Sequence, residues 1–260
     1  MAMTKFSRRS FMKKAGGGAA AATAVAVAPA GVAQAAKHNK VRYAMVIDTR
    51  RCSGCQACAI ACKTEFEVPL GMFRSWVEHV EVGSFPKTER RMLPRLCNHC
   101  SEPSCVDVCP TDPKATEKLD DGTVIVHNDR CIGCAKCAEA CPYDARFMNP
   151  FKGDATKTAG NGAADKCDFC QHRISQGVEP SCVNTCPGRA RIFGDLNDPS
   201  SAVAKLVENN ETTVLLRGKK TKPSVFYIGA DYLDAKRDPK ADQYFRLDSH
   251  RSERGTKRWS

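Results

Sequence analysis

The sequence predicts an α+β fold in which short strands and helices surround loops that carry cysteine. The first observation is that its 16 cysteines form four groups of four, with none left over. The second is that short β-branched runs precede two of the groups, which is typical of strands that lead into a binding loop. The third is that a proline follows three of the groups, where it would end a short helix.

Two of the groups share the spacing C-x2-C-x2-C-x3-C, and they are Cys52, Cys55, Cys58, Cys62 and Cys131, Cys134, Cys137, Cys141. The other two groups have wider middle gaps, and they are Cys97, Cys100, Cys105, Cys109 and Cys167, Cys170, Cys182, Cys186. In the tight spacing, three close cysteines hold one [4Fe–4S] cube and the fourth reaches a different cube. The sequence therefore predicts four [4Fe–4S] clusters with all 16 thiols as iron ligands, and a protein that moves electrons.

Disulfides and zinc are the alternatives. Cysteines two residues apart bridge poorly, because disulfide geometry is strict and both side chains leave one turn of the chain. Zinc fits the fourth group taken alone, since isolated C-x2-C pairs make tetrahedral sites. It does not fit the tight groups, where a single ion has no use for four thiols so close together. The four-cluster interpretation is the stronger one.

The N-terminus has the pattern of an export signal over residues 1–35. Arg8 and Arg9 are followed by Phe11 and Lys13, then by an Ala-rich apolar run and the small residues around Ala35. This pattern indicates a cleavable signal of the twin-arginine type. That route carries folded proteins, so clusters inserted in the cytoplasm would survive it. We therefore expect a periplasmic protein, and no later stretch is apolar enough to span a bilayer.

The formal charge of +11 does not require nucleic acid as a partner. The signal contains five basic residues and no acidic one, which leaves 35 basic against 29 acidic residues, or +6. Each oxidised cube with its four thiolates contributes about −2. Much of the basic excess is therefore expected to compensate cluster charge.

Four runs are predicted strands, namely residues 41–47, 123–126, 191–193 and 224–228. Each of the first two leads into a cysteine group. One longer helix is predicted over residues 199–209, with Asp198 or Ser200 as its N-cap. The helices inside the cysteine groups are expected to be about two turns long.

The main domain is expected to span residues 36–235. It includes an insertion over residues 63–96, whose alternating apolar residues predict a hairpin that covers a cluster and offers a docking surface. Residues 151–166 are rich in Gly and Ala and predict a surface loop. The polar, basic residues 236–260 predict a tail that lies on a partner or is disordered.

Three phrases give the sequence a resemblance to a known family: Leu-Cys-Asn-His-Cys at 96–100, Cys-Ile-Gly-Cys at 131–134 and Asp-Lys-Cys-Asp-Phe-Cys at 165–170. With the four-group order, they resemble the four-cluster ferredoxin-like electron-transfer (beta) subunits of bacterial molybdopterin oxidoreductases. The tetrathionate, polysulfide or thiosulfate, and dimethyl sulfoxide reductase subunits are closest in style. The resemblance extends from Val41 to Ile228. An export signal on this subunit is similar to the tetrathionate-reductase and nitrite-reductase accessory types.

The resemblance implies a fold of two ferredoxin-like modules, each holding two cubes, and a nested set of ligands. Cluster 1 would be held by Cys52, Cys55, Cys58 and Cys186, and cluster 2 by Cys167, Cys170, Cys182 and Cys62. Cluster 3 would be held by Cys97, Cys100, Cys105 and Cys141, and cluster 4 by Cys131, Cys134, Cys137 and Cys109. It also implies a molybdopterin catalytic subunit and a multi-helix quinone-binding membrane subunit as partners.

No catalytic residue is predicted, because no nucleotide or flavin loop is present and no cysteine remains for another metal. The expected function is electron relay within a respiratory reductase of a sulfur compound. The alternatives are a subunit that feeds a multihaem nitrite reductase and a stand-alone periplasmic polyferredoxin. His99 lies between two ligands and is a candidate for tuning a potential, as are Lys63, Lys136 and Lys166. The other reading of these four residues is ordinary packing and charge balance.

Overall fold

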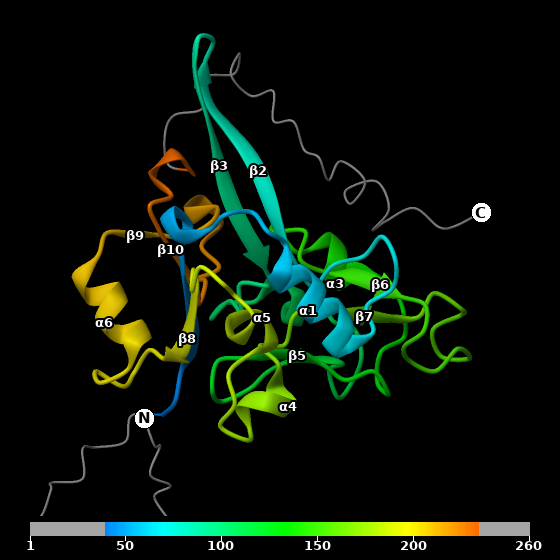
Figure 1. The fold of residues 1–260 in the computed structure, drawn as a ribbon. Coiled ribbons are helices and arrows are strands. Elements are labelled where there is room, and N and C mark those ends of the chain that lie inside the picture. Colours follow the sequence, from blue (N-terminus) through cyan, green and yellow to red (C-terminus); the bar gives the residue numbers. More distant parts are fainter. Residues whose placement is uncertain (1–39, 234–260) are drawn as a thin grey trace, which may run out of the picture. The chain divides into compact units, whose positions relative to one another are not determined.

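The computed structural model describes residues 40–233. The expected export signal and the expected basic tail lie outside the described residues. The described part is a mixed α+β unit, with one four-stranded sheet, three two-stranded hairpins and several short helices (Figure 1).

The four-stranded sheet joins the two ends of the described chain. Its strands, in spatial order, are β8 (Arg191–Asp195), β1 (Tyr43–Asp48), β10 (Val225–Ile228) and β9 (Thr212–Thr213). β1 is parallel to β10 and antiparallel to β8, with Val46 opposite both Phe226 and Ile192. The strands predicted near residues 41–47, 191–193 and 224–228 are confirmed.

The central strand β1 is buried on both faces. Met45 and Ile47 face the core beside the cysteine loops, whereas Ala44 and Val46 face the other side. This alternation follows from the two-residue period of a strand.

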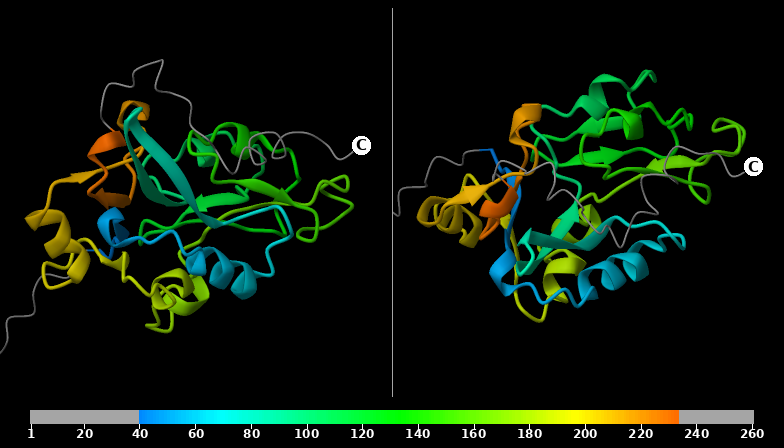
Figure 2. Two further views of the ribbon diagram at one scale, coloured as in Figure 1. Left: turned by 45° about the horizontal axis from the view of Figure 1, so that its top comes forward. Right: turned by 90° about the horizontal axis from the view of Figure 1, so that it is seen from above.

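Helix α6 (Ala202–Asn209) covers that other side, and Val203 is fully buried against Ala44 and Val46. α6 and α1 lie on opposite sides of the sheet (Figures 1 and 2). The predicted helix is confirmed, but the predicted N-cap residue was wrong. Ser201 Oγ accepts a hydrogen bond from the Ala204 N–H at 3.0 Å, whereas Ser200 and Asp198 bond to each other before the helix begins.

Three hairpins make up the remaining strands: β2 (Ser75–Ser84) with β3 (Lys87–Leu96), β4 (Thr116–Lys118) with β5 (Val124–Val126), and β6 (Phe147–Asn149) with β7 (Ala163–Asp165). The β2–β3 pair is the hairpin expected in the insertion. Strand β7 corrects the expected surface loop over residues 151–166. Its Ala163, Ala164 and Asp165 are buried, because they pair with β6 beside the cysteines.

The base of the β2–β3 hairpin packs on the first cysteine loop. Gln56 Nε2 donates to the Val77 carbonyl at 3.0 Å, and the Val77 N–H donates back to Gln56 Oε1 at 3.3 Å. Tyr227 of β10 donates its hydroxyl to the Pro94 carbonyl, which ties the hairpin to the sheet. The tip extends away from the short helices (Figure 1).

Five helices carry or adjoin cysteines: α1 (Ala57–Phe66), α2 (Ser104–Asp107), α3 (Lys136–Glu139), α4 (Gln171–Ile174) and α5 (Ser181–Asn184). Only α1 exceeds the expected two turns, and the others are single turns. Lys63 follows the last cysteine of the first group, where the other groups have proline, so the helix continues to Phe66. The 3₁₀ turns are η1 (Thr49–Arg51), η2 (Arg217–Lys219) and η3 (Asp231–Leu233). Within residues 40–233, no helix is long and apolar enough to cross a membrane.

The corrected cap gives a direct test. Ser201→Ala removes the acceptor for the Ala204 N–H and is expected to destabilise α6 by about 1 kcal/mol. Hydrogen-exchange mass spectrometry of the peptide over residues 202–209 should then show about fivefold faster exchange. Ser200→Ala is the matched control and should change exchange much less. Equal effects from the two substitutions would contradict this assignment of the cap.

Candidate metal centres

The structure brings the cysteines together across groups, and we call each set of four thiols a cage. Cage 3 is seen in one small cavity, which is lined by Cys97, Cys100, Cys105 and Cys141. Cage 4 is seen in a second cavity, which is lined by Cys109, Cys131, Cys134 and Cys137. In both cavities, one thiol comes from a different group in the sequence than the other three.

The electrostatic neighbours of the buried thiols support an assignment of the other two cages. Burial raises the pKa of Cys52, and the nearby thiolates of Cys58 and Cys186 raise this pKa further. We assign these residues to cage 1, together with Cys55, an exposed residue of the same loop.

Burial also raises the pKa of Cys62, with further contributions from Cys182 and Cys170. The pKa of Cys167 is raised well above the usual value of a thiol by burial, then by Cys62 and Cys182. We assign these four cysteines to cage 2. The lining of the two cavities agrees with the sets implied for clusters 3 and 4, and the full ligand assignment stays a prediction.

The cysteine loops fold around the cages because they adopt left-handed backbone angles at matching positions. In the first loop, Gly54 and Gln56 have φ of 76° and 60°; in the third, Gly133 and Ala135 have 69° and 60°. The next residue begins helix α1 or α3. In the third loop, the three thiols around this bend line the same cavity.

Backbone N–H groups donate to several thiols. Ala190 N–H donates to Cys186 Sγ at 3.2 Å, and Ala164 N–H to Cys131 Sγ at 3.4 Å. Burial alone would raise the pKa of Cys109, but hydrogen bonds from Thr111 and from backbone N–H groups lower it to about 7. Such donors favour the thiolate, which is the form that binds metal.

Most of the thiols lie in environments too dry for a bare thiolate. Burial raises the pKa of Cys100 and of Cys170 to about 12. A thiol in such a place ionises when a metal supplies the compensating charge. The donor set therefore fits [4Fe–4S] cubes, with four sulfur ligands in each cage. All 16 cysteines are free thiols in the structure, as the iron–sulfur interpretation requires.

Four buried cations lie among the cages. Arg146 and Arg191 were missed by sequence reasoning, because nothing in their local pattern marks a basic residue as buried. Lys166 was noted as a neighbour of a ligand, and it is only 2% exposed. Arg74 is buried but paired, with Asp165 at 2.5 Å and Asp168 at 3.4 Å.

His99 is fully buried between cages 2 and 3. Its Nδ1 accepts a hydrogen bond from the Val124 N–H at 3.0 Å, and its ring stacks on Phe169 with centroids 3.6 Å apart. Burial, then Lys166 and Arg146, holds the pKa of His99 well below its usual value. The imidazole is therefore neutral, and its role in tuning a potential stays a prediction.

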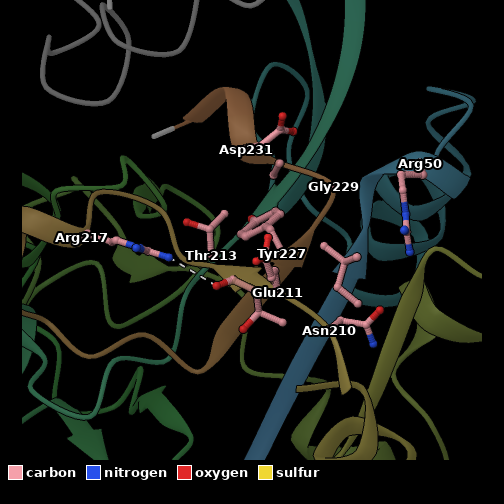
Figure 3. A pocket seen from close by; sticks show the side chains of 11 residues that line it. Arg50, Asn210, Glu211, Thr213, Arg217, Tyr227, Gly229 and Asp231 are labelled. Carbon is pink, nitrogen blue, oxygen red and sulfur yellow. Dashed lines mark hydrogen bonds between the residues drawn. The ribbon is translucent and has the colours of Figure 1, made fainter. Parts of the chain in front are cut away.

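A further cavity lies elsewhere. It has a volume of about 560 Å³ at the β9–β10 end of the sheet (Figure 3). Arg50 and Asp231 are among its lining residues, and Arg217 donates to the Thr212 carbonyl at its edge. None of its lining residues is a cysteine, so it is separate from the cages.

Comparison with known proteins agrees with this geometry. Residues 88–196 match the family described as a 4Fe-4S dicluster domain. A tetrathionate reductase subunit of Salmonella typhimurium is 48% identical, over 73% of this chain and 73% of the relative. The chain belongs to the family of iron–sulfur electron-transfer subunits of reductases.

Other members of this iron–sulfur subunit family are similarly related. Protein NrfC of Escherichia coli is 39% identical over 77% of this chain and 86% of the relative. The arsenate respiratory reductase iron-sulfur protein ArrB of Shewanella sp. strain ANA-3 is 35% identical over 72% of this chain and 96% of the relative. The cofactors of the present chain are four [4Fe–4S] clusters, and its function is electron transfer.

The loop of cage 4 offers a test of the backbone geometry. A Cβ at Gly133 would lie 2.9 Å from the Gly162 carbonyl oxygen and from Thr158, in addition to the strain of its positive φ. Gly133→Ala is therefore expected to open this loop and lower the iron and sulfide content by up to about a quarter, one cluster in four. The measurement is iron and acid-labile sulfide per chain after anaerobic purification.

Gly160→Ala is the matched control. Gly160 also has a positive φ, of 77°, but a Cβ there meets nothing within 4 Å. It should keep its full iron content. If both variants keep all of their iron, the close approach at Gly133 does not hold the loop.

Proposed function

We propose that this subunit relays electrons between a quinone-binding membrane subunit and a molybdopterin catalytic subunit of a respiratory reductase. The observation that carries this proposal is that one chain holds 16 free thiols, of which two sets of four line separate cavities. A sulfur compound such as tetrathionate, thiosulfate or polysulfide is the proposed terminal substrate. The 48% identity to a tetrathionate reductase subunit supports this choice.

The ligand sets are part of the proposal. Cluster 1 is held by cage 1, cluster 2 by cage 2, cluster 3 by cage 3 and cluster 4 by cage 4. The lining of the two cysteine cavities supports the sets for clusters 3 and 4. The mutual electrostatic effects of the buried thiols support the sets for clusters 1 and 2.

The cages follow one another in a row. The charge of Cys58 in cage 1 raises the pKa of Cys182 in cage 2. The charge of Cys97 in cage 3 raises the pKa of Cys167 in cage 2. The charge of Cys105 in cage 3 raises the pKa of Cys137 in cage 4. These electrostatic effects support the order 1–2–3–4, in which each cluster lies next to another.

We further propose that the row consists of two ferredoxin-like modules. α1 lies against α5 beside cages 1 and 2, and α2 lies against α3 beside cages 3 and 4. The second module, near residues 97–165, is inserted in sequence between the two halves of the first. The repeated helix pairing supports this interpretation.

When bound, the clusters supply one-electron redox chemistry at the iron. The chain's residues fix the spacing of the cages, donate backbone N–H groups to sulfur and keep water out of the interior. They perform no bond-making step. The site therefore contributes through geometry and electrostatics.

We propose that the chain is exported folded by the twin-arginine route, with residues 1–35 as its signal, and acts in the periplasm in anaerobic respiration. The Arg8-Arg9 pattern supports this. We propose that the tail over residues 236–260 and the insertion over residues 63–96 contact partners. Leu70 and Phe85 of the insertion are 94% and 92% exposed, which favours docking over a free carrier.

The nested ligand sets predict which distant cysteines act on the same cluster. Cys186→Ser and Cys58→Ser should alter the same electron paramagnetic resonance (EPR) signal of the reduced protein. Cys182→Ser, although close to Cys186 in sequence, should alter another signal, together with Cys62→Ser. Each variant should lose up to about a quarter of its iron. If Cys186→Ser and Cys182→Ser alter the same signal, the nested sets are wrong.

The partners predict what copurifies with the chain. From anaerobically grown cells, affinity-tagged protein extracted in mild detergent should elute with molybdenum in a fixed ratio and with a multi-helix membrane protein. Elution with a haem-staining protein and no molybdenum would instead support the nitrite-reductase alternative. Elution of the chain alone would support a free polyferredoxin.

A further inference from the structure

Three buried cations in the described chain have no carboxylate to balance them. Arg146, Lys166 and Arg191 are 5%, 2% and 2% exposed. Among residues 40–233, no Asp or Glu forms an ion pair with any of the three, whereas Arg74 has two carboxylate partners. A buried charge without a partner is strongly unfavourable. The partner of each of these cations must therefore be sought in the cages.

Arg146 lies between cages 3 and 4. Its Nη2 donates to Cys105 Sγ of cage 3 at 3.1 Å, and its Nη1 donates to Thr116 Oγ1 at 3.2 Å. The same guanidinium acts on Cys137 of cage 4 through its charge and a hydrogen bond. Arg146 thus faces one thiol from each cage.

Arg191 lies in the equivalent position between cages 1 and 2. Its Nη1 is 3.9 Å from Cys182 Sγ of cage 2, and its charge also acts on Cys52 and Cys58 of cage 1. Its Nη2 is buried without a hydrogen-bond partner in the described chain. That nitrogen remains available to a sulfide or thiolate of a bound cluster.

Lys166 lies at the remaining junction, between cages 2 and 3. It precedes Cys167 of cage 2, and its Nζ donates to the Cys167 carbonyl at 2.6 Å and to the Val124 carbonyl. Its charge acts on Cys105 of cage 3 and on the His99 ring. Each junction in the row of cages therefore contains one buried cation.

Reduction adds one negative charge to a cluster, so a fixed cation nearby stabilises the reduced form and raises its potential. Burial strengthens this effect, because little water screens the charge. A cation shared by two cages raises both potentials together.

We propose that Arg191, Lys166 and Arg146 set the cluster potentials pairwise, each raising those of the two cages between which it lies. This proposal depends on the ligand sets proposed above. In this proposal the three cations act on the clusters through their charge, while the thiols remain the ligands. It also accounts for their burial, since the negative charge of the clusters replaces the missing carboxylates.

The test is a redox titration, monitored by EPR, of the full chain with its clusters. Arg146→Gln should lower the potentials of clusters 3 and 4 and leave cluster 1 unchanged. The expected loss is about tenfold in the equilibrium constant for reduction, or about 59 mV for one electron. Arg191→Gln should lower the potentials of clusters 1 and 2 and leave the potential of cluster 4 unchanged. Lys114→Gln is the control. Lys114 is an exposed cation on the loop that follows Cys109, and its replacement should shift no cluster potential by a comparable amount.

A charge-conserving variant covers failure to assemble. If Arg146→Gln loses iron, Arg146→Lys is measured in its place. It should retain clusters 3 and 4 with potentials within about threefold of wild type in equilibrium constant, or about half of 59 mV. Full iron content with unshifted potentials in the Gln variants, or an equal shift of all four clusters, would overturn the proposal. So would an Arg146→Lys variant whose potentials fall as far as those expected for Gln.

Failure of the ligand sets gives a different result. The cysteine variants assign each EPR signal to a cage before any cation is changed. If those signals do not follow the cages, the proposed ligand sets fail. If the signals follow the cages but do not respond to the cations, only the present proposal fails.

Discussion

The proposed ligand sets impose one constraint on which the fold depends: each cage takes thiols from two separate cysteine groups. Cys141 completes the lining of cage 3, and Cys109 that of cage 4. Cage 1 needs Cys186 beside Cys52, although they belong to the first and last groups of the sequence. The sheet meets this need, because β8 follows the last cysteine group and pairs with β1, which precedes the first. The remaining strands and helices hold the other cysteine loops close enough to share a cage.

The module around cage 4 has little apolar material of its own. Its buried cluster consists of Ala115, Ala163 and Ala164 with Cys131 and Cys137. Alanine buries little area, so these side chains stabilise the module only weakly. A cofactor with four ligands links four points of the backbone and supplies the missing core, as structural metal sites do in other small domains. We therefore expect the folding of this part of the chain to be coupled to cluster insertion.

Much of the fold could be predicted from the sequence wherever the signal is local. Cysteine spacing indicated the cage loops, and β-branched runs indicated β1, β8 and β10. The N-cap of α6 was wrong because Asp198, Ser200 and Ser201 are all good cap residues, and only the backbone decides which hydroxyl meets the Ala204 N–H. The burial of β7 was missed because its sequence, Ala-Ala-Asp, has no strand pattern. Arg146 and Arg191 were missed because their burial depends on cages built from distant segments.

The nested order of the cages also constrains when the clusters can be completed. Cage 1 draws its fourth thiol from Cys186, and cage 2 draws three from residues 167–182, so neither is complete until most of the described chain has been made. Cage 3 and cage 4 close within residues 97–141, so they can form earlier. The completed clusters then fix the first and last cysteine groups together. Threading an extended chain through a narrow export channel would require opening all four cages, because each cage joins two cysteine groups. A route that accepts folded proteins avoids this cost, in agreement with the proposed twin-arginine export.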